Sequence, residues 1–234
     1  MTLNQRQEDI LKKIVSEYIR QAEPVSSERL KNKYKTDLSP ATIRNEMQRL
    51  TDMGYLYQPH TSAGRIPSDK GYRYLVDELV RKEIEDELIK NEIEKIKEIE
   101  DSFSFLRQVN RILSDSSSSL AFSYLPEEDF CLRENWASVF KGPEFSDSGY
   151  IKNFFSMVES LERNIDLFEI EDFSIKVYIG KEMPMPRCRE FSVVVSQCFF
   201  RKKKTVLAMV GPKRMPYNRN IPLINSVIKI LREK

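Results

Sequence analysis

The stretch SPATIRNEMQRLTDMGYLYQPHTSAGRIPSDKGYR, residues 39–73, decides the fold of the N-terminal part of this chain. Ser39 is a favourable N-cap, and Pro40 suits the first position of a helix because the N–H that it lacks would be unpaired there. Gly54 can adopt, at low cost, the left-handed conformation that ends a helix. Between these ends, apolar residues recur at helical spacing and predict one buried stripe: Ile43, Met47 and Leu50.

The opposite face of this predicted helix carries small, amide-bearing and cationic side chains. At about 100° per residue, it comprises Ala41, Thr42, Arg44, Asn45, Gln48 and Arg49, with Ser39 at its start. Arginine can pair with guanine, and asparagine or glutamine with adenine, so a helix that reads base edges in a major groove requires such a face. Taken alone, the helix is more simply interpreted as having an ordinary solvated surface.

The residues that follow favour the nucleic-acid interpretation. A short strand at 55–57, the polar turn QPHTSAGR at 58–65 and a returning strand at 66–67 predict a two-stranded ribbon, after which Asp69 is expected to cap the next helix. A helix followed by such a ribbon is a winged helix, whose wing contacts the phosphate backbone or the minor groove. The candidate contacts, which position the protein without specifying sequence, are His60, Thr61, Ser62 and Arg65.

Two further helices are expected before this segment. Residues 5–22 carry apolar side chains on one face, with Asn4 and Gln7 as a capping pair, and Ser26 or Ser27 begins a shorter second helix. Three helices and a wing make a compact domain, predicted to span residues 1–76. Four basic residues are expected near the DNA backbone, where they would add salt-dependent affinity that is blind to sequence: Arg20, Lys31, Lys33 and Lys35.

This segment resembles the DNA-binding domain of the HrcA family of bacterial heat-shock repressors. The resemblance rests on SPATIRNEM (39–47), GYL (54–56) and QPHTSAGRIPSDKGYR (58–73). It implies a repressor that binds double-stranded DNA at an inverted-repeat operator upstream of chaperone genes, as a homodimer. It also implies that a chaperonin keeps the repressor in its DNA-binding state, so that heat, by diverting the chaperonin, releases the genes.

Composition indicates a soluble, cytoplasmic protein of two domains. No apolar run approaches the roughly 20 residues of a membrane span, and the N-terminal MTLNQRQEDI lacks the apolar stretch of a signal peptide. The three cysteines have no C-x-x-C spacing and are expected to be buried, free thiols. The net charge of +2 averages a mildly basic head, an acidic middle (77–173) and a basic tail (174–234), and we expect pairing within one fold to explain most of this segregation.

Residues 77–115 are predicted to form a long connecting helix, because apolar residues continue at helical spacing from Asp69 to Leu113. Two interpretations stay open. The helix carries dimer contacts, or it lies against its own C-terminal domain.

Residues 116–234 predict an α+β domain, an antiparallel sheet with helices on it. The expected strands are 120–124, 135–140, 174–179, 191–200 and 205–210, and RKKK (201–204) would form a hairpin tip. Asp147 would begin a helix and Asn220 another. The first of these helices is expected to turn four apolar residues inward: Ile151, Phe155, Val158 and Leu161.

The resemblance to the same family resumes here at KGPEFSD (141–147), SLE (160–162), VYIGKE (177–182) and VGPKRMPYNR (210–219). It implies a GAF-like domain. Family members are longer, because an extra domain that helps dimerisation interrupts this part, whereas the present chain passes from Tyr124 to Asn135 without room for it. The dimer contact is therefore expected from Ile89–Leu113 or from the terminal sheet and helix.

No catalytic site is predicted. The chain has no glycine-rich phosphate-binding loop, and His60, its only histidine, lies in the wing. A histidine cluster for a metal ion is excluded, so a wing contact or a hydrogen bond within the turn is the expected role of His60. We predict neither enzyme activity nor a cofactor. The alternatives to a repressor are a ligand-gated winged-helix regulator and a protein-interaction module without specific DNA binding.

Overall fold

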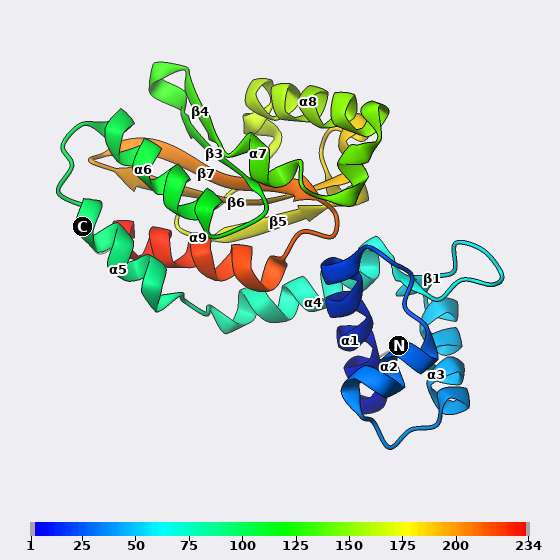
Figure 1. Cartoon of the computed structure of the whole chain (residues 1–234). Helices are drawn as coiled ribbons and strands as arrows, with labels where there is room; N and C mark the ends of the chain where they lie inside the picture. The colour runs from blue at the N-terminus through cyan, green and yellow to red at the C-terminus, as the bar shows by residue number, and fades with distance from the viewer. Residues whose placement is uncertain (1–2, 233–234) are drawn as a thin grey trace. The chain divides into compact units, whose positions relative to one another are not determined.

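The computed structural model describes residues 3–232 and divides into two compact units, Met1–Glu78 and Leu79–Lys234. They are called the N-terminal and the C-terminal unit below. Figure 1 shows their helices and strands.

The N-terminal unit is a three-helix domain with a wing. Its helices and strands are α1 (Gln5–Gln21), α2 (Ser27–Tyr34), α3 (Pro40–Asp52), β1 (Leu56–Tyr57) and β2 (Ile66–Pro67). The predicted caps are confirmed: Asn4 and Gln7 form a reciprocal capping box on α1, Ser26 caps α2, and Ser39 caps α3 with Pro40 at its first position. The core comprises Ile10, Leu11, Ile14, Val15, Leu30, Ile43, Met47 and Leu50.

A buried carboxylate, Glu17 of α1, joins the first two helices. Arg20, Lys33 and Tyr34 donate hydrogen bonds to it. Burial alone would raise the pKa of Glu17, but these hydrogen bonds outweigh it and hold the pKa below its usual value. Two of the cations expected near the DNA backbone, Arg20 and Lys33, thus form hydrogen bonds with Glu17.

The long connecting helix is a wrong prediction, because the segment forms three helices. They are α4 (Asp69–Lys82), α5 (Glu87–Ile96) and α6 (Ser102–Asp115). Asp86 and Asp101 accept hydrogen bonds from the first backbone N–H groups of α5 and α6, so each starts a new helix rather than extending the old one. Asp69 was predicted to cap α4, but it is Ser68 whose Oγ accepts a hydrogen bond from the backbone N–H of Gly71, in the first turn of that helix.

Of the two interpretations left open for this segment, the structure shows the packing on its own C-terminal domain. α5 contacts α9 (Tyr217–Arg232), and α6 contacts β3 (Leu120–Leu125) and β4 (Phe130–Glu134). The apolar face of α5 and α6 is buried there, including Ile89, Ile93, Phe105, Leu106, Val109 and Leu113.

The C-terminal unit contains a five-stranded antiparallel sheet in the order β4-β3-β7-β6-β5, which confirms the α+β prediction. The remaining strands are β5 (Ile175–Ile179), β6 (Phe191–Phe200) and β7 (Lys203–Pro212). Arg201 and Lys202 form the hairpin tip, both with positive φ, whereas Lys203 and Lys204 of the predicted tip (201–204) belong to β7. α7 (Trp136–Val139), α8 (Ser148–Arg163) and short 3-10 turns complete the unit.

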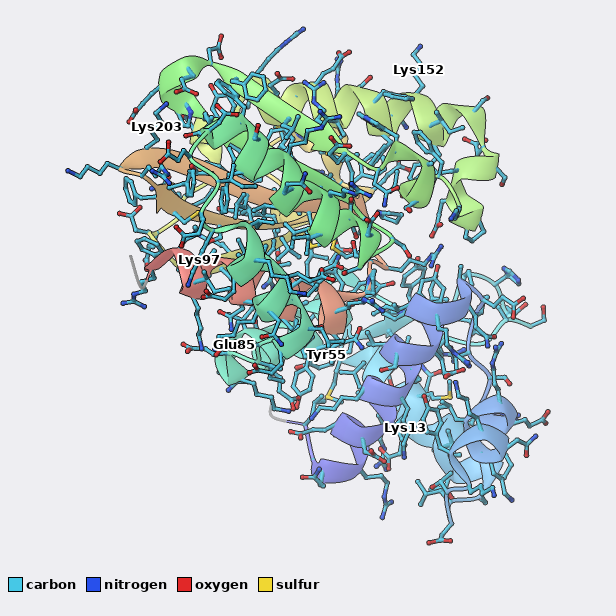
Figure 2. The ribbon with its side chains drawn as sticks, turned by 60° about the vertical axis from the view of Figure 1, so that its left-hand side comes forward. Lys13, Tyr55, Glu85, Lys97, Lys152 and Lys203 are labelled. Carbon is cyan, nitrogen blue, oxygen red and sulfur yellow. The ribbon has the colours of Figure 1, made fainter. Side chains whose placement is uncertain are left out.

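Helices cover both faces of this sheet (Figure 1). On one face, α8 supplies Phe154, Met157 and Leu161 to a hydrophobic cluster with Phe122 and Val193. On the other face lie α5, α6 and α9, and the rings of Phe105 and Phe200 stack with centroids 3.9 Å apart. Figure 2 shows Lys152, on the outer side of α8, extending away from the fold. Burial on both faces explains why β6 reads FSVVVSQCFF, an almost continuous apolar run.

Three local predictions in this unit are wrong. The strand expected at 135–140 lies instead at Phe130–Glu134, because Asn135 has a positive φ of 71° and caps α7 through Ser138 N–H. α9 begins at Tyr217 rather than at Asn220, which is buried and donates to Ser119 Oγ over 2.8 Å. Phe155 is 43% exposed, and its neighbour Phe154 occupies the core.

The acidic middle and the basic tail pair with each other, as expected. Ion pairs join Lys203 to Glu128, Arg214 to Glu144 and Lys229 to Glu85, and Figure 2 labels Lys203 and Glu85. Hydrogen bonding from Lys229 lowers the pKa of Glu85 by more than burial raises it.

The cysteine prediction is confirmed in part. All three thiols are free; Cys188 and Cys198 are buried, and Cys131 is half-buried. Burial raises the pKa of Cys131 and of Cys198 to about 12. These thiols are therefore poor nucleophiles.

Truncating Phe154 is expected to destabilise the C-terminal unit much more than truncating Phe155. Phe154→Ala leaves a cavity, which costs about 3–5 kcal/mol. Phe155→Ala mainly loses a stacking contact with Trp136, whose ring centroid is 5.0 Å away, worth about 0.5–1.5 kcal/mol. Urea unfolding followed by the fluorescence of Trp136, the only tryptophan, measures both losses. Equal losses of unfolding free energy in the two variants would contradict the burial of Phe154 and the exposure of Phe155.

Candidate nucleic-acid interface

The outward face of α3 is exposed along its length. Thr42 is half-buried, while the remaining members are exposed: Ser39, Ala41, Arg44, Asn45, Gln48 and Arg49. Ser39 and Thr42 are partly occupied by the cap, because Ser39 Oγ accepts from the Thr42 N–H and lies 2.9 Å from Thr42 Oγ1. The buried stripe of the same helix is as predicted, with Ile43, Met47 and Leu50 in the core.

Arg44 and Asn45 are the members of this face that are free to bind a ligand. Within residues 3–232, neither side chain has a hydrogen-bond or ion-pair partner. A guanidinium and an amide without internal partners keep all their hydrogen-bonding capacity for an incoming molecule.

Gln48, by contrast, is bonded to the wing. Arg65 donates from Nη2 to Gln48 Oε1 over 2.9 Å and from Nε to Thr51 Oγ1 over 3.1 Å. Gln48 in turn donates from Nε2 to Asp52 Oδ1 over 2.8 Å. The structure thus brings together two residues that the sequence assigned to separate elements, one on the helix and one in the wing.

Arg49 is also held from within the unit. Its Nη1 lies 3.2 Å from Oε1 of Glu46, a buried carboxylate on the inner side of α3. Gln7 Nε2 donates to the other oxygen of Glu46 over 3.2 Å. Glu46 therefore links α3 to α1 and restrains one exposed cation of the candidate face.

The wing is a minimal antiparallel ribbon, with Leu56 opposite Pro67 and Tyr57 opposite Ile66. Its tip exposes His60, Thr61 and Ser62. The hydrogen bond within the turn uses the carbonyl oxygen of His60, which accepts from Ala63 N–H over 2.9 Å, and leaves the imidazole exposed.

Two positions that the sequence reading did not single out shape this wing. Gln58 donates from Nε2 to the carbonyl oxygens of Thr61 and Ala63, over 2.8 and 2.9 Å, and so closes the loop. Val25 exchanges two backbone hydrogen bonds of 2.9 Å with Arg65 at the root of the wing. The QPHTSAGR stretch itself pointed to a turn, but nothing local indicated that Val25, far away in sequence, would pair with it.

The part of the chain that the structure describes shows neither a metal site nor a membrane-spanning helix. No group of three or more His, Cys, Asp or Glu side chains among residues 3–232 is arranged to hold a metal ion. In the same residues no helix is both long and apolar enough to cross a membrane.

Two family models match this chain. "Winged helix-turn-helix transcription repressor, HrcA DNA-binding" covers residues 2–81, and "HrcA protein C terminal domain" covers residues 69–221. Over its full length the chain also shares a fold with the crystal structure of a hypothetical protein, at a TM-score of 0.81 and 22% identity, covering 99% of this chain and 98% of the other. The sheet with helices on both faces fits a GAF-like domain.

Relatives named "Heat-inducible transcription repressor HrcA" show the same similarity. The Natranaerobius thermophilus protein is 42% identical over 153 residues, which cover 64% of this chain but only 39% of that protein. The Acetivibrio thermocellus protein is 46% identical over 133 residues, covering 55% and 37%. The matched part of this chain thus spans less than half of the length of these relatives.

The Thermoanaerobacter pseudethanolicus protein of the same name aligns over 332 positions at 27% identity, covering 99% of this chain and 96% of that protein. Because this chain has 234 residues, at least 98 of those 332 positions have no counterpart here. In this chain β3 and β4 form a direct hairpin, with Leu125 opposite Phe130. The two family models together match residues 2–221, and on that basis the chain belongs to the HrcA family.

Proposed function

We propose that this protein is a cytoplasmic, non-enzymatic, sequence-specific repressor that binds an inverted-repeat operator of heat-shock or chaperone genes. The observation that carries the proposal is the pair Arg44 and Asn45, which stand exposed on α3 without partners in the described part of the chain. Family membership supplies the class of target.

The residues of the interface divide into two roles. Arg44, Asn45 and Gln48 read base edges in the major groove, because their side chains form the bidentate pairs that distinguish bases. The wing residues His60, Thr61 and Ser62 position the protein on the phosphate backbone, together with Arg65. Two of the five N–H donors of the Arg65 guanidinium serve Gln48 and Thr51, which leaves three for a phosphate.

Asn45→Ala is expected to weaken operator binding by about 1–3 kcal/mol and to relax the preference at one base pair. Its affinity for random DNA should be unchanged, because Asn45 carries no charge. Selection of bound sequences from a random DNA pool first defines the operator, and titrations of operator and random DNA then compare the variant with wild type.

Asn91→Ala is the matched control, since Asn91 is an exposed amide on α5. It should bind both DNAs as wild type does. A wild-type protein that selects no sequence from the pool would refute specific binding and favour the protein-interaction alternative.

We propose a dimer as the active form, since two helices on a two-fold axis read an inverted repeat. Most of the apolar face of α5 and α6 is buried within its own unit, whereas Leu88 and Phe103 stay exposed on these helices. The terminal sheet and helix are the other candidate, and the outer strands of the sheet are β4 and β5. An outer strand has free backbone groups with which a second chain can pair.

Sedimentation is expected to show two chains both in the free protein and on the complete operator, and the same dimer is expected to bind an isolated half-site more weakly. A half-site with its partner half scrambled serves as the control, because it removes the second recognition surface and leaves the protein unchanged. A monomer both free and on the complete operator would refute the dimer.

We also propose that a chaperonin maintains the binding-competent state. The apolar strand β6 is buried on both faces, so partial unfolding would expose a segment prone to aggregation. Arg201–Lys204 would act as charged gatekeepers beside it. A change of about 1–2 kcal/mol alters the folded fraction several-fold, so a marginal fold suffices as a thermal sensor.

After mild heating, operator binding is expected to fall and to recover when chaperonin and ATP are supplied. Chaperonin without ATP is the control, since it binds unfolded chains without releasing them. Undiminished binding by soluble protein after heating would contradict this mechanism.

Hollows in the C-terminal unit give little support to the ligand-gated alternative. One, lined by Phe173, Ile175, Ile221 and Ile228 among others, has a volume of about 210 Å³, below the roughly 300–1,000 Å³ of typical ligand pockets. Another, of about 480 Å³, lies along the outer side of α6. Its residues Arg107 and Arg111 have side chains more than 70% exposed, as in an open surface depression.

A further inference from the structure

We propose that Arg65 and Asp52 fix the amide orientation of Gln48, and that both are therefore specificity-determining positioning residues. The inference deepens the proposed function and rests on it. It assigns Asp52 a role that its sequence position does not suggest, and it gives Arg65 a role besides backbone contact.

Arg65 is anchored before its side chain reaches α3. Its backbone N–H and C=O each make a 2.9 Å hydrogen bond with Val25. Its guanidinium then makes a two-point contact, through Nε to Thr51 and through Nη2 to Gln48. Thr51 Oγ1 is itself oriented, because it donates to the carbonyl oxygen of Met47 over 2.9 Å. The donor that faces Gln48 therefore comes from a restrained group.

The two neighbours of the Gln48 amide permit only one of its two orientations. A guanidinium has donors only, and an ionised carboxylate has acceptors only. Oε1 must therefore face Arg65, and Nε2 must face Asp52, as the 2.9 and 2.8 Å bonds show. A flipped amide would lose both hydrogen bonds and would set donor against donor and acceptor against acceptor.

The position of Asp52 supports this assignment. Asp52 is the last residue of α3, where the helix dipole disfavours a negative charge. Its hydrogen bond to Gln48, one turn earlier, gives the carboxylate a specific function at that place. Among the described residues, no hydrogen bond or ion pair orients the side chains of Arg44 and Asn45. Of the three side chains proposed to read bases, only Gln48 is therefore oriented before DNA binds.

The fixed amide keeps one N–H and one oxygen lone pair free, since each of its polar atoms uses only one of two bonding positions internally. A donor and an acceptor side by side complement adenine, which offers N7 as acceptor and N6–H as donor in the major groove. We therefore infer that Gln48 reads an adenine and that its fixed orientation opposes the other bases.

Three variants separate a positioning role from a charge effect. Gln48→Ala identifies the base pair that Gln48 reads, and it should lower discrimination there by about 5- to 150-fold. Asp52→Asn preserves shape but allows either amide orientation. Arg65→Lys preserves the positive charge but cannot contact Thr51 and Gln48 in the same planar arrangement.

The measurement is the binding profile of each variant over operators that differ at single base pairs, at several salt concentrations. Asp52→Asn and Arg65→Lys should lose discrimination at the base pair that Gln48→Ala identifies, and at no other. The Arg65→Lys salt dependence should equal that of wild type, since the charge is retained. Asp52→Asn combined with Gln48→Ala should be no worse at this position than Gln48→Ala alone.

Asp37→Asn is the matched control, because Asp37 is an exposed carboxylate of the same unit, outside α3. It should leave the profile unchanged while removing the same charge. Unchanged discrimination in Asp52→Asn and Arg65→Lys, or losses at base pairs other than the one read by Gln48, would overturn the inference. A wild-type protein without sequence preference would instead refute the proposed function itself.

Discussion

The backbone pairing of Val25 with Arg65 is the constraint on which the candidate interface depends. It ties the segment before α2 to the root of the wing through two hydrogen bonds. The approach is so close that a Cβ at Gly64 would lie 2.3 Å from the carbonyl oxygen of Val25, so no larger residue fits there without a shift of backbone. Because this root is fixed, the Arg65 side chain meets α3 at Gln48 and Thr51. Helix and wing thereby form one surface.

Buried carboxylates determine which cations remain for this surface. Glu17 forms ion pairs with Arg20, Arg29 and Lys33, and Glu46 forms an ion pair with Arg49. A buried carboxylate needs such partners, since leaving it unpaired would be strongly destabilising. Some cationic side chains of the N-terminal unit therefore form ion pairs within the unit, whereas Arg44 on the outward face of α3 stays exposed.

In the C-terminal unit, the main constraint is that both faces of the sheet are buried. Strands β6 and β7 are apolar along most of their length, and α8 covers one side while α5, α6 and α9 cover the other. This requirement uses the apolar faces of α5 and α6, which the sequence alone also allowed to serve a dimer. In this chain β3 and β4 form a direct hairpin, so the sheet is continuous there.

The sequence by itself determined the features that depend on neighbours in the chain. Periodicity and capping residues located α1, α3 and β6 closely, and the outward face of α3 was identified in full, because each follows from local geometry. Similarity to a family supplied the proposed function. Tertiary structure decided the rest: the division of residues 69–115 into three helices, the register that makes 130–134 a strand, and the burial of Phe154 instead of Phe155. It also decided the bond from Arg65 to Gln48, since residues 17 positions apart meet only after the wing has paired with Val25.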